Sequence, residues 1–253
     1  MFSIPLVLYI VTEMLFCFVL LFCAIAATSA ISVLDFSYNP ASDSGTHASL
    51  DLSSMGALPP SFTICTAIMI KAWTNGASTS VHIFKAMDQE GNHLISLILN
   101  PAWTSRFKFE IQGEIFKALA KFPWIFPLDW VHTCMSVEQS SGKINLVANG
   151  ALLENNTFEG IKTMDHSSIV SMKIGEKFSG IWANFNIFSS SLSAEKMKNM
   201  TSAGNTACGE LGDLVRWNTK RWALSGNGGF VKELGFDERP CGEGVGDNHE
   251  RGD

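Results

Sequence analysis

The chain has 253 residues, and 46% of them are apolar, so a single large domain with a substantial core can form. Its formal charge of −6 and its isoelectric point near 5.5 do not suit nucleic acid or an anionic membrane, because either partner needs a basic face. The longest run of basic residues is Lys220-Arg221. The sequence therefore predicts neither partner.

Residues 1–30 are predicted to be a signal peptide. An apolar run, Leu15–Ala27, is followed by Thr28-Ser29-Ala30, whose small residues suit a cleavage site. The alternative is an uncleaved anchor, which needs about 20 apolar residues. That anchor would place Glu13 inside the bilayer at roughly 2–3 kcal/mol. We therefore expect export, with a mature chain that is not inserted into a membrane.

Cysteine usage agrees with export. If Cys17 and Cys23 leave with the signal peptide, four of the six cysteines remain. The remaining four are Cys65, Cys134, Cys208 and Cys241. An even number in an exported chain predicts two disulfides, for which three pairings can be drawn. No spacing of the C-x2-C or H-x3-H kind occurs, so a zinc site is not expected.

Two glycosylation motifs also fit an exported chain. They are Asn155-Asn156-Thr157 and Asn199-Met200-Thr201. We predict glycans on Asn155 and Asn199.

In the first half of the chain, strand patterns alternate with turn signals. The predicted strands are Ile31–Tyr38, Phe62–Trp73, Val81–Met87, His93–Leu99 and Arg106–Phe116. Residues 39–60 are rich in Ser, Gly, Asp and Pro and are predicted to be a surface loop. In the fifth strand, Phe107, Phe109, Ile111 and Ile115 alternate with polar residues and are expected to share one face.

The clearest local signal is Trp130–Leu153, which is predicted to form three strands joined by two turns. The second turn is Asn149-Gly150, and both residues tolerate the positive φ of a type I′ turn. Further strands are predicted at Ser167–Gly175, Ile181–Phe188 and Leu214–Leu224. A short helix from Ala194 to about Met200 is expected to be capped by Ser193.

About ten strands, one short helix and no alternation of strands with helices predict an all-β fold. We expect residues 31–225 to form an antiparallel two-sheet sandwich. Residues 226–253 are rich in glycine and acidic residues and are predicted to be a loosely ordered tail tied by Cys241.

Three patches resemble a known family by their order and spacing. They read F-T-I-C at Phe62–Cys65, V-H-T-C-M-S at Val131–Ser136 and S-G-I-W-A-N-F-N-I-F at Ser179–Phe188. Together they resemble the concanavalin A-like lectin superfamily, and within it the pentraxin and laminin-G-like domains. The resemblance implies a jelly-roll sandwich and a Cys65–Cys134 disulfide, which leaves Cys208 and Cys241 as the second pair.

Pentraxins bind ligand through calcium held partly by a Glu-Gln-Asp run. This sequence reads I-G-E-K-F at Ile174–Phe178 in that place, with one carboxylate beside a lysine. Calcium takes about six to eight oxygen ligands. We therefore predict no cofactor, and the turn with Asp88, Glu90 and Asn92 is the alternative calcium site.

The sequence predicts no catalytic site. Hydrolases on this sandwich carry E-x-D-x-x-E, which is absent, and no G-x-S-x-G, H-E-x-x-H or phosphate-binding loop occurs. If Glu110 and Glu114 share one strand face they stand about 13 Å apart. Glycoside hydrolysis needs about 5–9.5 Å between its carboxylates.

We therefore predict a secreted, lectin-like recognition module that binds a glycan or an extracellular protein and that is compatible with oligomerisation. The alternatives are the N-terminal ligand-binding module of a larger membrane receptor and a glycan-active enzyme. Trp103 and Trp124, beside prolines in predicted loops, are the candidate ligand contacts, because the other tryptophans of a sandwich usually lie in the core.

Overall fold

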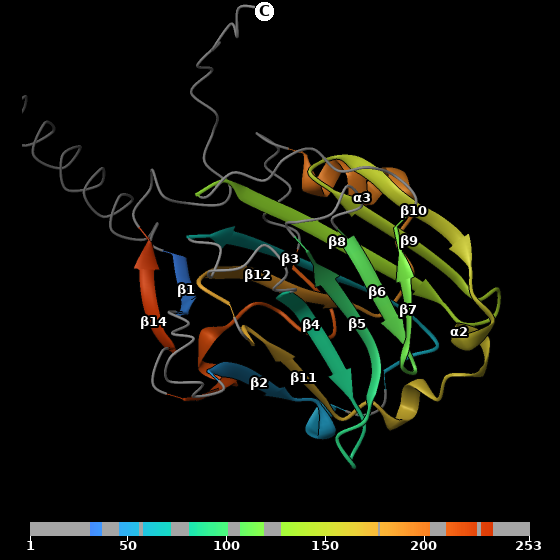
Figure 1. Ribbon diagram of the computed structural model, residues 1–253, viewed down its shortest axis with the longest axis horizontal. Helices are drawn as coiled ribbons and strands as arrows, with labels where there is room; N and C mark the ends of the chain where they lie inside the picture. Colours follow the sequence, from blue (N-terminus) through green and yellow to red (C-terminus); the bar gives the residue numbers. More distant parts are fainter. Residues whose placement is uncertain are drawn as a thin grey trace, which may run out of the picture.

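The computed structural model describes residues 31–36, 46–55, 58–71, 81–100, 107–118, 128–176, 178–202, 211–226 and 229–234. They form two antiparallel sheets of seven strands each, packed face to face as a sandwich (Figure 1). The predicted all-β, two-sheet fold is confirmed. None of the helices among the described residues has the length and apolar character needed to cross a membrane.

Sheet A has the strand order β10-β9-β8-β3-β12-β1-β14. Its strands are β1 (Ile31–Phe36), β3 (Ser61–Ile70), β8 (Trp130–Glu138), β9 (Lys143–Ala148), β10 (Ala151–Thr157), β12 (Gly180–Phe188) and β14 (Gly229–Leu234). Sheet B has the order β13-β2-β11-β4-β5-β6-β7. Its strands are β2 (His47–Asp51), β4 (Val81–Met87), β5 (His93–Leu99), β6 (Phe107–Ile111), β7 (Glu114–Lys117), β11 (Ser171–Ile174) and β13 (Trp222–Ser225).

The helices among the described residues are short. They are α2 (Glu159–Thr163) and α3 (Ala194–Thr201), with three 3-10 turns, η1 (Ser53–Met55), η2 (His166–Ser168) and η4 (Thr219–Arg221). The side chain of Ser193 accepts a hydrogen bond from the Lys196 N–H at 3.2 Å, as predicted for the cap of α3. The helix α3 packs on β8, β9 and β10 of sheet A.

The core lies between the two sheets because each strand turns alternate residues inward. In β3, for example, Phe62, Ile64 and Ile68 join the main buried cluster. The ring of Phe185 in sheet A meets that of Trp222 in sheet B edge to face, with 5.1 Å between centroids. Aromatic contacts of this kind join the two layers.

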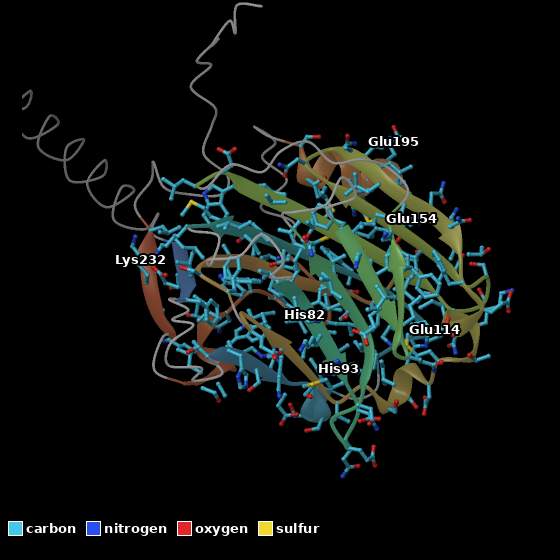
Figure 2. The ribbon with its side chains drawn as sticks, viewed as in Figure 1. His82, His93, Glu114, Glu154, Glu195 and Lys232 are labelled. Atoms are coloured by element: carbon cyan, nitrogen blue, oxygen red, sulfur yellow. A yellow bond between two sulfur atoms is a disulfide. The ribbon has the colours of Figure 1, made fainter. Side chains whose placement is uncertain are left out.

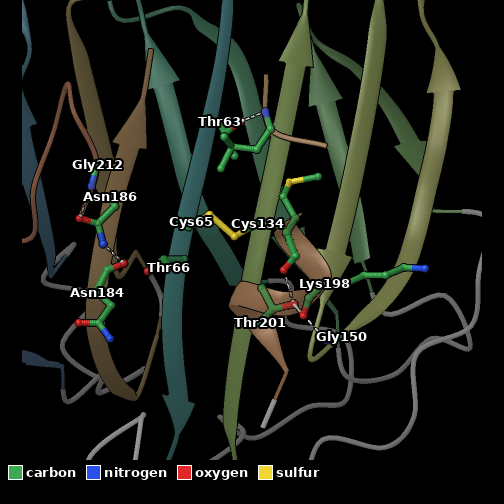
Figure 3. Close-up of a disulfide and its surroundings, with 12 residues drawn as sticks. Thr63, Cys65, Thr66, Cys134, Gly150, Asn184, Asn186, Lys198, Thr201 and Gly212 are labelled. Carbon is green, nitrogen blue, oxygen red and sulfur yellow. Dashed lines mark hydrogen bonds between the residues drawn. A yellow bond between two sulfur atoms is a disulfide. The ribbon is translucent and has the colours of Figure 1, made fainter. Parts of the chain in front are cut away.

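The disulfide joins Cys65 to Cys134, the pairing that the resemblance implies (Figure 3). The two residues lie directly opposite each other on β3 and β8. They face outward from sheet A and are buried beneath α3 with Met197 and Met200. Cys208 and Cys241 lie outside the described residues.

The Trp130–Leu153 segment forms β8, β9 and the start of β10, as predicted. Asn149 and Gly150 both have positive φ, 43° and 77°, as a type I′ turn requires. The N–H of Gly150 donates to the Thr201 hydroxyl of α3 at 3.0 Å, and that hydroxyl donates to the Met197 carbonyl (Figure 3). Thr201 is 2% exposed, so this bond ties the turn to the helix.

Two of the predicted elements before β8 are wrong. The predicted loop 39–60 contains β2 and η1, because the five-residue alternation of β2 is too short to stand out beside its polar neighbours. The predicted strand Arg106–Phe116 is a hairpin, β6–β7, because Gln112 and Gly113 adopt φ of 48° and 87° and turn the chain. Ile115 therefore lies opposite Glu110 and is 58% exposed.

The C-terminal predictions also change. The predicted closing strand Leu214–Leu224 is a strand only from Trp222 onward, because the Asn186 side-chain oxygen accepts bonds from Gly212 and Trp217 and holds an irregular loop. Residues 229–234, predicted to be part of a loose tail, form β14 and pair with β1. The predicted strand Ser167–Gly175 shortens to β11 because η2 takes its first residues.

One buried histidine makes stability depend on pH. His166 is 3% exposed, and neither ring nitrogen has a hydrogen-bond partner among the described residues. Burial lowers the pKa of His166 from its ordinary 6.5, although the nearby Met164 backbone and the charge of Asp165 act in the opposite direction. Below about pH 6.5 the unfolded chain therefore takes up a proton that the folded chain resists.

We expect the free energy of unfolding to be highest above pH 6.5 and to fall at lower pH, by at most about 1.4 kcal/mol per pH unit from this group. Urea unfolding at pH 7.5 and pH 5.0 measures the fall. His166→Leu removes the titrating group and should flatten this dependence. An equal fall in the variant would show that other groups cause it.

Candidate functional site

The outward face of sheet A is a structural surface. The helix α3 and the disulfide cover one part of it, together with Val147, Phe188, Met197 and Met200. A second apolar cluster, formed by Val33, Ala67, Ile181, Ala183 and Leu234, is buried on the neighbouring strands. The same face also carries polar side chains that already bond one another: the Asn145 amide donates to the Ser136 hydroxyl, and Lys71 pairs with Asp35.

The outward face of sheet B is polar across its five inner strands and ends in Ala223 and Ile115 on the two edge strands. Residues that lie directly opposite one another form a row that we call the polar row: Ala223, Ser49, Lys173, Lys85, Ser96, Glu110 and Ile115. The five members from Ser49 to Glu110 alternate along their strands with core residues, so the pleat directs them away from the core. Such a row can present several polar groups to one ligand.

Two contacts organise the middle of the polar row. The Ser96 hydroxyl donates to Glu110 Oε2 at 3.2 Å. The Lys85 ammonium, whose residue is only 6% exposed, donates to Glu176 Oε2 at 2.5 Å from the turn after β11. These contacts fix both carboxylates in place.

A second row lies two residues further along β5, β6 and β7. It contains His82, Ile98, Lys108 and Lys117, again directly opposite one another (His82 is labelled in Figure 2). Lys108 therefore faces Lys117, as Lys173 faces Lys85 in the polar row. Burial lowers the pKa of Lys108, and the charge of Lys117 lowers it further.

A groove opens beside Ser49 of the polar row, between β2 and β11. It has a volume of about 370 Å³ and is lined by Ser49, Leu50, Asp51, Ser53, Gln89, Val170 and Ser171. We call it the serine groove. Its volume falls within the range of small-molecule sites, about 300–1,000 Å³. Ser49 belongs to both the groove and the polar row, and it lies directly opposite Lys173.

The polar groups of the serine groove are held in place. Asp51 lies opposite Ser171 on neighbouring strands, and its Oδ1 accepts the Ser53 N–H at 2.8 Å. The hydrogen bonds from Ser53 lower the pKa of Asp51, so this carboxyl is ionised at neutral pH. The groove thus combines hydroxyl donors and acceptors with one fixed carboxylate, a set that suits a polyhydroxyl ligand.

Several residues singled out in the sequence lie elsewhere. Trp103 and Trp124 are outside the described residues. Asn155 is exposed on the edge strand β10 and Asn199 is exposed on α3. Glu110 and Glu114 were expected on one strand face, but the β6–β7 turn places them on opposite faces.

In the turn that is the candidate calcium site, the Asp88 carboxylate accepts hydrogen bonds from the turn itself. Asp88 Oδ1 accepts the Asn92 N–H at 2.7 Å, and Oδ2 accepts the Asn92 side-chain amide at 2.8 Å. These bonds close the β4–β5 hairpin. In the part of the chain that the structure describes, no three His, Cys, Asp or Glu side chains gather as a metal site would require.

No protein-family model matches the sequence, and no curated protein matches it by sequence. By structure, the chain is similar to a native heptameric SAP-like pentraxin from Limulus polyphemus, with a TM-score of 0.60 and 14% identity over 80% of this chain and 94% of that one. It is also similar to the full extracellular region of zebrafish Gpr126/Adgrg6, with a TM-score of 0.57 and 15% identity over 79% of this chain and 26% of that one.

A third similar structure is a proposed carbohydrate-binding protein from Bacteroides ovatus, with a TM-score of 0.54 and 16% identity over 81% of this chain and 60% of that one. At these identities the similarities concern the fold. The chain has the concanavalin A-like, lectin-type fold that its sequence resembles.

Proposed function

We propose that this chain is a non-enzymatic extracellular module that binds a glycan or a protein ligand on the outward face of sheet B. The observation that carries the proposal is the contrast between the two faces. Sheet A is covered in part by α3 and apolar clusters, and several of its outward polar side chains already bond one another, whereas sheet B presents the polar row and the serine groove. Among the similar structures are a pentraxin, a receptor extracellular region and a proposed carbohydrate-binding protein, which supports a binding role.

An extracellular location is supported by the disulfide, because such bonds persist in oxidising compartments. The predicted glycans agree with the choice of face. Asn199 lies on α3, and Asn155 lies opposite Asn145, whose amide bonds Ser136 on the outward face of sheet A. Glycans at both positions would cover sheet A and leave sheet B accessible.

Catalysis is the less favoured proposal. The carboxylates on the sheet B face already have partners, since Glu110 accepts from Ser96 and Glu176 pairs with Lys85. A general acid must instead be free to reach the bond that it protonates. The same binding face would also serve if the chain were the N-terminal module of a receptor.

A large side chain in the serine groove should weaken glycan binding. We expect Ser171→Trp to weaken glycan binding at least about tenfold, because the indole would occupy the space beside Asp51. A glycan array probed with the full chain, in calcium and in EDTA, measures the loss. Ser190→Trp, at an exposed position just after β12 of sheet A, is the matched control. Loss in the control, with binding intact in Ser171→Trp, would contradict the assignment of the binding face.

A further inference from the structure

We infer that protonation of His166 opens the serine groove, so that the groove releases its ligand in acidic solution. This inference rests on the proposed function and adds a means of regulation to the same site. His166 begins η2, which leads directly to Val170 and Ser171 in the lining of the groove. A change at the histidine therefore acts on one wall of the groove.

The serine groove lies between two segments that hydrogen-bond to each other. β2 and η1 form one wall, and the start of β11 forms the other. The N–H of Leu52 donates to the Val170 carbonyl at 2.8 Å, and the N–H of Val170 donates to the Met87 carbonyl at 3.0 Å. Asp51 lies directly opposite Ser171. The groove therefore keeps its shape only while Val170 stays in this position.

Three buried side chains, Met164, His166 and Ile169, hold the segment before β11 against the core. Met164 and Ile169 belong to the main apolar cluster. The ring of His166 meets that of Phe62 on β3 edge to face, with 5.5 Å between centroids. Of these three anchors, His166 is the one that can gain a charge.

The surroundings of His166 suit its neutral form. Neither ring nitrogen has a hydrogen-bond partner among the described residues, and β3 carries no charged residue. On the neighbouring elements, Lys162 and Glu159 of α2 pair with each other, and Glu138 of β8 bonds within its own turn. Asp165 favours the proton, but burial outweighs it and lowers the pKa of His166. A protonated ring would be a buried charge without an acceptor, so protonation requires that the ring reach water.

Movement of the ring into water displaces Val170. Only three residues separate Val170 from His166, and η2 is closed by a bond from the Ile169 N–H to the His166 carbonyl at 3.2 Å. A local opening of this short segment breaks the bonds of Val170 to Leu52 and Met87. The two walls of the groove then separate, and a ligand that contacts both loses its contacts with one.

The direction of the pH dependence follows from the two states of the groove. In the closed groove the His166 ring resists the proton, and in the open groove its pKa returns to the ordinary 6.5. Opening is therefore favoured below about pH 6.5, by at most about tenfold for each pH unit, because one proton is taken up. A ligand that binds only the closed groove opposes protonation and is released as the pH falls. Such a module would hold its ligand in neutral extracellular fluid and release it in an acidic vesicle.

Hydrogen exchange tests the opening without any ligand. The full chain, secreted from eukaryotic cells, is labelled at pH 7.5 and pH 5.0, and each rate is divided by the intrinsic rate at that pH. We expect the amides of Leu52, Ile169 and Val170 to exchange up to about thirtyfold faster at pH 5.0 on this scale. His166→Leu and His166→Met keep the anchor apolar and should each abolish the increase. The control is His132→Gln on β8 of sheet A, which should retain it.

A glycan array probed at pH 7.5 and pH 5.0, with EDTA present, measures release. We expect the affinity for the glycans bound at pH 7.5 to fall at least about threefold at pH 5.0. In His166→Leu the affinity should stay the same at both pH values, because the segment no longer contains a group that titrates in this range.

Three results would overturn the inference. They are exchange at the three amides that is no faster at pH 5.0, an equal increase in both His166 variants, and glycan binding that is equal at the two pH values. If binding is independent of pH but is weakened by Ser171→Trp, the switch is wrong and the proposed binding face stands. If the array shows no ligand, the proposed function fails, whereas an increase in exchange that both His166 variants abolish still supports the opening of the groove.

Discussion

Replacing Cys65 and Cys134 together with alanine should lower the free energy of unfolding by about 4 kcal/mol. The bond closes a loop between residues 69 apart, and chain entropy assigns about 3 kcal/mol to a loop of about 15 residues and about 4.7 to one of about 100. The loop connects β3 to β8, the central pair of sheet A. Because domains are stable by only about 5–15 kcal/mol, secretion of the variant should also fall.

Urea unfolding of the oxidised chain and of the double variant measures this loss. Reduction of the unmodified chain is the matched comparison. A larger loss on reduction than in the double variant would support the predicted second bond, Cys208–Cys241. A loss below about 1 kcal/mol in the double variant would show that packing under α3, rather than the disulfide, holds the two strands together.

Trp182→Ala should destabilise the fold by about 3–5 kcal/mol. Trp182 is fully buried in β12, and its ring meets those of Phe36 and Phe178 edge to face, with centroids 5.5 and 3.9 Å away. Removing the indole leaves a cavity that two aromatic neighbours cannot close. Thermal and urea unfolding should both show the loss.

Trp182→Phe is the matched control. The indole N–H has no hydrogen-bond partner among the described residues, so phenylalanine removes an unsatisfied donor while it keeps most of the aromatic contact. We expect it to cost less than half as much as alanine. Equal losses in the two variants would contradict the explanation by cavity volume, because phenylalanine fills most of the space that alanine leaves empty.

Elements with strong turn signals were predictable from the sequence. β4 and β5 have the predicted bounds because polar turns mark both ends of each. The Asn149-Gly150 turn and the Ser193 cap depend on backbone rules that act within a few residues. The β6–β7 turn, at Gln112-Gly113, was missed because the alternation of Arg106–Phe116 continues through it.

The candidate site could not be predicted in the same way. The alternation of Lys108 with core residues predicts that it faces outward. That it lies opposite Lys117 follows from the β6–β7 turn, which the continuous alternation of the sequence does not indicate. Lys173 meets Lys85 only because β11 pairs with β4, strands more than 80 residues apart. Register between distant strands is set by the packed core and not by local composition. The predicted contacts, Trp103 and Trp124, rest on local loop signals and lie outside the described residues.

The bond between Gly150 and Thr201 would restrict when the predicted glycan at Asn199 can be added. Thr201 is the hydroxyl residue of the motif that begins at Asn199, and in the folded chain it is buried and bonded on both sides. The enzyme that attaches the glycan must recognise that hydroxyl residue as part of the N-x-S/T motif. If Asn199 is glycosylated as the sequence predicts, attachment must therefore precede the docking of α3. Thr157, two residues after Asn155, is exposed and stays accessible after folding. Fast folding would then leave the chain with one glycan, and slow folding with two.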